Sequence, residues 1–91
     1  MTADAEQHWQ LYIIECDDGS FYTGITNNMI NRFASHSSGK GAKYFRRCKP
    51  VRLVYQELAL SRSEAASREY AVKRLTRKQK IDLIRRAECL S

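Results

Sequence analysis

The sequence lacks the features of several common classes of protein. No apolar run approaches the roughly 20 residues that a helix needs to span a bilayer, and the N-terminal stretch MTADAEQHW has acids but none of the lysines or arginines of a secretory signal. The three cysteines, Cys16, Cys48 and Cys89, are odd in number and form no CxxC pair. This usage argues against a disulfide framework or a zinc site. It favours a reducing cytoplasm, in which cysteines act as small apolar residues.

The sequence also lacks internal repeats and low-complexity segments. Its 91 residues are enough for one small domain. Apolar residues, cysteine included, make up 43% of the chain and are spread along it, which predicts a folded domain rather than a disordered chain. We expect an N-terminal tail over residues 1–8 and a single domain over residues 9–88.

Acidic residues are missing from the middle of the chain, where none lies between Asp18 and Glu57. The net charge is +6, and the basic residues gather in two stretches. The first holds Arg32, Lys40, Lys43, Arg46, Arg47, Lys49 and Arg52, and the second holds Lys73, Arg74, Arg77, Lys78, Lys80, Arg85 and Arg86. Nucleic acid is the simplest partner that would explain these charges, because phosphate contacts supply sequence-independent affinity. A solvated basic surface is the alternative. An acidic membrane surface is a weaker choice, because neither stretch lies on a strongly amphipathic helix.

The segment LYIIECDDGSFYTGIT, residues 11–26, predicts a β-hairpin. Asp17, Asp18 and Gly19 fit a three-residue loop whose last residue has a positive φ, a conformation that favours glycine. A two-residue loop at Asp18 and Gly19 would shift the pairing by one residue and turn one strand over. We favour the three-residue loop.

This loop sets the pairs across the hairpin. Tyr12 then lies opposite Gly24, and Ile14 lies opposite Tyr22. Both tyrosines fall on one face of the sheet as diagonal neighbours, close enough for their hydroxyls to reach one ligand. The opposite face is the predicted core face, formed by Leu11, Ile13, Glu15, Phe21, Thr23 and Ile25.

A helix and a third strand are predicted after the hairpin. Either Asn27 or Asn28 can cap the helix, and its expected apolar stripe is Met29, Ile30, Phe33 and Ala34. Arg32 and His36 lie on one side of this helix, at the margin of the stripe. After a loop rich in glycine and basic residues, VRLVYQEL over residues 51–58 predicts a strand.

Two capping boxes predict the remaining helices. Ser61-Arg62-Ser63-Glu64 opens a helix that runs to about Leu75, and Thr76-Arg77-Lys78-Gln79 opens a last one. The last helix directs Ile81, Ile84 and Ala87 inward. The predicted fold is α+β, with a small three-stranded, mainly antiparallel sheet flanked by helices.

Glu69 falls on the face of its helix that Ala65 and Ala66 mark as closely packed. Burying a lone carboxylate costs several kcal/mol unless it is paired or binds a metal ion. One interpretation is a salt bridge, for which the candidate partners are Arg62, Lys73 and the basic loop residues. The other is a metal ligand, because small neighbours leave room for a hydrated ion.

Together these residues resemble the GIY-YIG nuclease superfamily. Its first triplet is similar to Gln10-Leu11-Tyr12, and its second to Tyr22-Thr23-Gly24. The family's arginine, its following histidine or tyrosine, and its metal-binding glutamate match Arg32, His36 and Glu69. The similarity covers residues 9–86 and is closest to the small stand-alone YhbQ-like bacterial proteins.

The resemblance implies a metal-dependent endonuclease that hydrolyses phosphodiester bonds in DNA, with branched or damaged DNA as candidate substrates. Glu69 would hold Mg²⁺ or Mn²⁺, and Arg32 would clamp a phosphate oxygen. Tyr12 and Tyr22 would position the attacking water. His36 is a second candidate base or a phosphate donor.

The expected nucleic-acid contacts combine the second triplet with both basic stretches. They are Gly24, Lys40, Lys43, Arg46, Arg47, Lys73, Arg77 and Lys78. A non-catalytic nucleic-acid-binding module with the same fold is the alternative. A module that only binds has no reason to keep the whole set of Tyr12, Tyr22, Arg32, His36 and Glu69 together.

Overall fold

The computed structural model describes residues 8–39 and 42–90. The predicted tail, apart from His8, lies outside the described residues, and so does Lys40. The elements are β1 (Gln10–Cys16), β2 (Phe21–Thr26), α1 (Met29–Ser37), the short 3-10 helix η2 (Lys43–Arg46), β3 (Pro50–Leu58), α2 (Arg62–Lys73) and α3 (Arg77–Leu90). In these residues no helix combines the length and apolar character needed to cross a membrane.

The strands form one antiparallel sheet in the order β2-β1-β3, which confirms the predicted α+β fold. Tyr12 lies opposite Gly24, and Ile14 lies opposite Tyr22. Gly19 has a φ of 83°, so the three-residue loop and its register are confirmed. The Cys16 amide donates to the Ser20 carbonyl at 2.9 Å and closes the loop.

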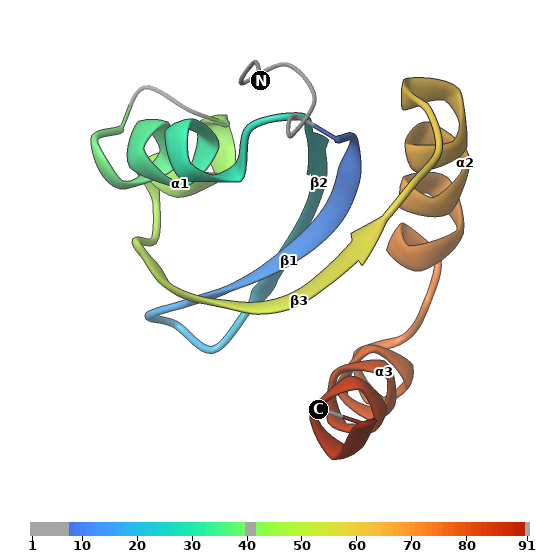
Figure 1. Cartoon of the computed structure of the whole chain (residues 1–91). Helices are drawn as coiled ribbons and strands as arrows, with labels where there is room; N and C mark the ends of the chain where they lie inside the picture. The colour runs from blue at the N-terminus through green and yellow to red at the C-terminus, as the bar shows by residue number, and fades with distance from the viewer. Residues whose placement is uncertain (1–7, 40–41, 91) are drawn as a thin grey trace.

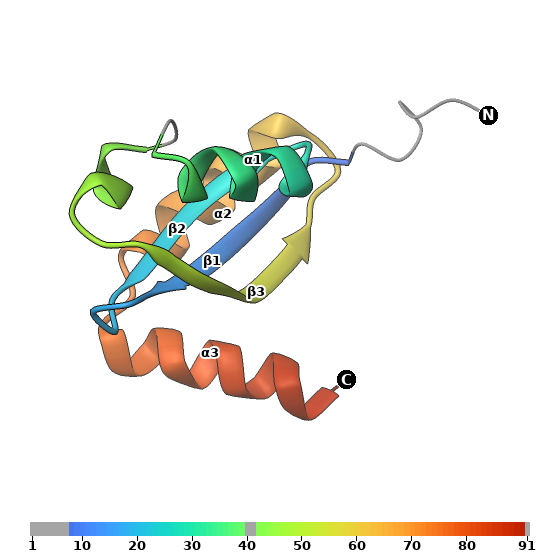
Figure 2. The ribbon, with the colours of Figure 1, turned by 90° about the vertical axis from the view of Figure 1, so that its left-hand side faces the viewer.

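Helices cover both faces of this sheet (Figure 1; Figure 2). On one side, α1 and η2 lie over a buried cluster formed by Tyr12, Ile14, Cys16, Phe45 and Cys48. On the other side, α2 and α3 lie over a cluster formed by Leu11, Ile13, Val72 and Ile84. The sequence predicted a core on the second side only, and the structure corrects this. The central strand β1 is a nearly continuous apolar run, as expected for a strand that is buried on both faces.

The helix starts follow the predicted caps. Asn28, rather than Asn27, caps α1, and its side chain accepts a hydrogen bond from the Asn31 amide at 3.1 Å. Ser61 accepts from the Glu64 amide at 3.1 Å, and Thr76 accepts from the Gln79 amide at 3.2 Å, as the capping boxes require. Helix α2 ends at Lys73, one turn before the following box.

The apolar face of α1 differs from the prediction. Met29 and Phe33 pack on the sheet, but the Ile30 side chain is 83% exposed and Ala34 is exposed. The buried residue of the helix is His36, which is 1% exposed. The face directed at the sheet therefore follows the i, i+4, i+7 spacing from Met29 to His36. The sequence placed His36 at the margin of the apolar stripe, and the structure corrects this by burying the imidazole in the core.

Candidate functional site

An aromatic cluster lies on the α1 side of the sheet, built from the hairpin, α1 and η2. Its members are Tyr12, Tyr22, His36, Tyr44 and Phe45. The ring centroids of Tyr12 and Tyr22 are 6.2 Å apart, so the two phenols share a face, as the hairpin register predicts. Phe45 closes the cluster, with its ring 4.9 Å from Tyr22 and 4.3 Å from His36.

Gly24 makes this packing possible. It is buried opposite Tyr12, and a Cβ atom at this position would stand 2.5 Å from the Tyr12 hydroxyl oxygen and 2.7 Å from its Cζ atom. The same Cβ would lie 3.1 Å from the ring of Tyr22. A side chain here would have to push the tyrosines aside, so the geometry requires glycine.

His36 holds Tyr12 through a defined hydrogen-bond chain. Burial, assisted by the charge of Arg32, lowers the pKa of His36 to about 4, so the ring is neutral at pH 7. The Ala42 amide donates to Nδ1 at 3.3 Å, which places the ring proton on Nε2. Nε2 then donates to the Tyr12 hydroxyl oxygen at 2.9 Å. The hydroxyl proton of Tyr12 is thereby left for a different acceptor.

Charges from two helices act on the Tyr12 hydroxyl. Burial is the main reason why its pKa is raised above the ordinary value, and Tyr22 adds to the effect. Arg32 of α1 lowers the pKa of Tyr12, whereas Glu69 of α2 raises it. Tyr12 is therefore a neutral phenol at pH 7 in this structure. Its hydroxyl lies within the electrostatic reach of both a guanidinium and a carboxylate.

Glu69 is half-buried and ion-paired. Its carboxylate lies 3.0 Å from the Lys73 ammonium one turn along α2, and the two side chains are 24% and 51% exposed. Of the salt-bridge partners that the sequence allowed, the structure selects Lys73, while Arg62 lies over the ring of Trp9. An ion pair this exposed stabilises a protein by only about 0–1 kcal/mol, so Glu69 can exchange its partner at little cost.

The donor set at Glu69 suits a hydrated hard cation. Within the described residues, Glu69 belongs to no group of three or more metal-binding side chains. Mg²⁺ is commonly held by one or two carboxylates together with water and substrate phosphate oxygens. A single half-buried carboxylate can take part in this kind of binding, and Glu69 is the residue that would hold the ion.

Three basic residues of the first stretch lie in or directly after η2, which carries Tyr44 and Phe45 of the aromatic cluster. Lys43, Arg46 and Arg47 are exposed in η2 and directly after it, on the α1 side of the sheet. Tyr44 and Phe45 belong to this cluster although the sequence pattern did not predict them as site residues. Tyr44 hydrogen-bonds to Ser20 and lies 5.3 Å from the ring of Tyr22. Aromatic residues inside the basic run KYFRR were the available signal, because such runs often bind nucleic acid.

The second basic stretch lies elsewhere. Arg77 donates to the Gly19 carbonyl at 2.8 Å and stacks over the ring of Phe21 at 4.9 Å, so it ties α3 to the hairpin. Lys78 is exposed on the same helix. Helix α3 lies across the sheet from α1 and η2 (Figure 2). Arg52 of the first stretch, on β3, lines the same hollow as Arg77 and Arg85 of the second, so the two stretches meet on that side of the sheet. Lys73 lies beside Glu69.

Comparison with known proteins decides the family. A model described as the GIY-YIG catalytic domain matches residues 8–82. The chain belongs to the GIY-YIG family. Membership implies a nuclease-type function and binding of nucleic acid.

Small bacterial proteins of the UPF0213 group are similar to this GIY-YIG chain over most of its length. A UPF0213 protein of Desulfotalea psychrophila is 49% identical over 88% of this chain and 74% of its own. One of Clostridium perfringens is 53% identical over 81% of this chain and 80% of its own.

Two solved structures show the same fold. The UPF0213 protein BH0048 from Bacillus halodurans, solved by NMR, is 47% identical, covers 85% of this chain and 82% of its own, and has a TM-score of 0.55. The protein EF2693 from E. faecalis is 40% identical over 90% of this chain and 86% of its own, with a TM-score of 0.61. The α+β arrangement is therefore shared among these small proteins.

Proposed function

We propose that this GIY-YIG protein is a metal-dependent endonuclease that hydrolyses phosphodiester bonds in DNA, with branched or damaged DNA as candidate substrates. The observation that supports this most directly is the environment of the Tyr12 hydroxyl. It accepts a hydrogen bond from His36 at 2.9 Å and lies in the fields of Arg32 and Glu69. A tyrosine that is hydrogen-bonded to an imidazole, and whose hydroxyl is affected by the charges of a guanidinium and a carboxylate, suits attack on a phosphate.

Glu69 is the proposed metal ligand. A bound Mg²⁺ or Mn²⁺ ion would supply positive charge to the phosphate and its leaving oxygen. Glu69 must exchange Lys73 for the ion, and the exposure of this pair keeps the cost low. Arg32 is exposed at the end of the cluster, where its planar guanidinium can clamp a non-bridging phosphate oxygen with two parallel hydrogen bonds.

The two phenols orient the attacking water in this proposal. Since Tyr12 accepts from His36, its own proton is free to be donated into the site. His36 is buried with both ring nitrogens engaged, so it acts through Tyr12 as a positioning residue. Tyr22 is half-buried beside Tyr44 and presents the more accessible of the two phenols.

A second candidate function is nucleic-acid binding without catalysis. The exposed Lys43, Arg46 and Arg47 flank Tyr44, which is the arrangement of charge and stacking surface that single-stranded nucleic acid uses. This surface would bind whether or not Glu69 holds a metal ion. The two functions therefore differ in their dependence on Glu69.

The test is Glu69→Gln. This change keeps the shape of the side chain but removes the charge that holds a divalent ion. We expect the variant to stay folded, to bind DNA as the wild type does, and to lose metal-dependent cleavage by several orders of magnitude. Cleavage is measured with Mg²⁺ or Mn²⁺ on single-stranded, duplex and branched DNA, and binding is measured separately.

Lys73→Gln is the matched control. It breaks the same ion pair from the other side, at a cost of about 0–1 kcal/mol in the free energy of unfolding, and leaves the carboxylate in place. Because Lys73 is also an expected nucleic-acid contact, cleavage is compared at saturating DNA. Cleavage that persists there in Lys73→Gln and disappears in Glu69→Gln supports a metal ligand. Cleavage at the wild-type rate in Glu69→Gln contradicts that role. Wild-type protein that binds DNA but never cuts it leaves the binding module as the function.

A further inference from the structure

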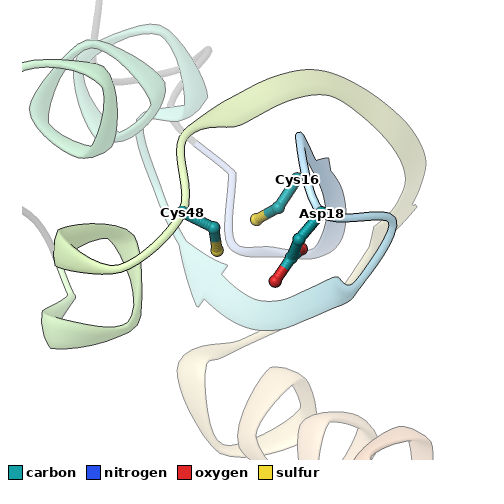
Figure 3. A group of neighbouring side chains, drawn as sticks. All are labelled: Cys16, Asp18 and Cys48. Atoms are coloured by element: carbon teal, nitrogen blue, oxygen red, sulfur yellow. The ribbon is translucent and has the colours of Figure 1, made fainter.

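Three metal-binding side chains converge at the closed end of the hairpin. Cys16 ends β1, Asp18 lies in the hairpin loop, and Cys48 lies in the turn that leads into β3. Their two sulfur atoms and a carboxylate oxygen all lie within 4.8 Å of one another. Figure 3 shows the two thiols directed toward each other and the carboxylate directed toward Cys48.

Two hydrogen bonds between Asp17 and Lys49 hold these segments together without help from Cys16, Asp18 or Cys48. Asp17 and Lys49 directly follow the two cysteines, and the Asp17 amide donates to the Lys49 carbonyl at 2.9 Å. The Lys49 amide donates in return to the Asp17 carboxylate at 3.1 Å. This reciprocal pair fixes the two thiols side by side, so the donors are already placed before any ligand arrives.

Asp18 is oriented by its own loop. Its Oδ1 atom accepts from the Ser20 amide at 3.0 Å and from the Ser20 hydroxyl at 2.5 Å. Asp18 is exposed, whereas Cys16 and Cys48 are 2% and 7% exposed and both are free thiols. The group therefore has a buried sulfur side and an open carboxylate side through which an ion can enter.

We propose that Cys16, Asp18 and Cys48 bind a zinc-type divalent ion, distinct from the hard cation proposed at Glu69. Two sulfur donors select soft metals over Mg²⁺. Zinc takes thiolate sulfur at about 2.3 Å and carboxylate oxygen at about 2.0–2.2 Å in a tetrahedron, which brings donor atoms to separations within the 4.8 Å seen here. Water fills the fourth position. On binding, each thiol releases its proton to solvent as the metal–sulfur bond forms, so one ion displaces two protons.

The sequence pattern did not predict this metal-binding group. Cys16 and Cys48 have no CxxC spacing, and an odd number of cysteines suggested small apolar residues. Two cysteines in an apolar core would need no carboxylate beside them. The ion would join the hairpin loop to the turn before β3, so its binding should raise the melting temperature.

The experiment uses the reduced, full-length chain with Cys89→Ser, which removes the third thiol. Cd²⁺ is added under anaerobic conditions and followed by its thiolate charge-transfer absorption, and Zn²⁺ is then added as a competitor. We expect one Cd²⁺ per chain, displacement by Zn²⁺ and a raised melting temperature. Adding Cys16→Ser or Cys48→Ser should remove the absorption.

Asp18→Asn decides the result if the buried cysteine variants fail to fold. Asp18 is exposed, so this variant should fold, yet its metal affinity should fall about tenfold or more. Glu69→Gln should bind Cd²⁺ like its parent. Absence of thiolate absorption in the folded reduced protein, or unchanged affinity in Asp18→Asn, would overturn the proposal. Loss of both thiols on exposure to peroxide, without any metal binding beforehand, would identify a disulfide pair instead.

Discussion

At the scale of single residues, Gly24 allows the two tyrosines to pack directly against the backbone of β2. Replacing it by alanine puts a methyl group 2.5 Å from the Tyr12 hydroxyl oxygen. The hydrogen bond from His36 holds the Tyr12 ring in place, so the ring cannot move away freely from the new methyl group. We expect Gly24→Ala to lower the free energy of unfolding by about 1–3 kcal/mol and to reduce cleavage beyond what the loss of folded protein explains.

Gly19→Ala is the control for Gly24→Ala. It adds the same methyl group to the same hairpin, but nothing lies within 4 Å of the new Cβ atom. Its cost comes only from the positive φ, about 1–2 kcal/mol. Denaturant unfolding and cleavage of both variants give the comparison. Equal cleavage by the two variants would show that the contact of Gly24 with Tyr12 has no part in the site.

His36 makes the stability of the protein depend on pH. Burial and Arg32 lower its pKa from an ordinary value of 6.5 to about 4 in the folded state. Between these values the unfolded chain binds the extra proton, so stability is complete above about pH 6.5 and falls as the pH drops toward 4. The expected loss is about 3 kcal/mol.

His36→Gln identifies the contribution of this ring. Thermal or denaturant unfolding of the wild type and the variant is measured from pH 7 to pH 4, and the difference between the two curves cancels the carboxyl groups that they share. We expect the variant to be less stable at pH 7 and the difference to shrink toward pH 4. A difference that stays constant over this range would mean that His36 does not titrate as its burial predicts.

At the scale of elements, η2 and the residue after it carry exposed charges beside the aromatic residues Tyr44 and Phe45. Replacing Lys43, Arg46 and Arg47 together by alanine should weaken DNA binding and flatten its salt dependence. Each lost phosphate contact should reduce the slope of log K against log salt by about 0.9 for duplex DNA. Binding is measured over a series of salt concentrations, with unrelated DNA sequences giving similar slopes.

Helix α3 offers a matched set of charges on the other side of the sheet. Lys78, Arg85 and Arg86 are exposed there, and their replacement by alanine removes the same charge. If DNA lies on the tyrosine side, the η2 variant should change the slope more than the α3 variant. Equal changes would show that both basic stretches contact phosphates. An unchanged slope in both variants would mean that these residues form a solvated basic surface without phosphate contacts.

At the scale of the whole molecule, stability depends on two cores that share one strand. Ile13 and Ile14 are adjacent, point to opposite faces of β1, and are both 0% exposed. Each change to alanine should cost about 2–5 kcal/mol in the free energy of unfolding. Ile30→Ala, at a side chain that is 83% exposed, should cost less than about 0.5 kcal/mol. A small effect at Ile14 would mean that the α1 side is not a true core.

The sequence alone was enough to predict the features that depend on neighbours along the chain. Loop length and Gly19 determined the hairpin register, which placed Tyr12 and Tyr22 on one face. Capping residues marked where α2 and α3 begin. These predictions succeeded because turn geometry, strand alternation and caps are set by interactions within a few residues.

Only the tertiary structure decided the features that join distant segments. It buried His36 against Tyr12 and left Ile30 exposed. It also brought Tyr44 and Phe45 into the cluster and placed Cys48 beside Cys16. It also placed η2 and α3 over opposite faces of the sheet and buried the second of these faces. Such contacts depend on which helix covers which face of β1, and no periodicity within one segment carries that information.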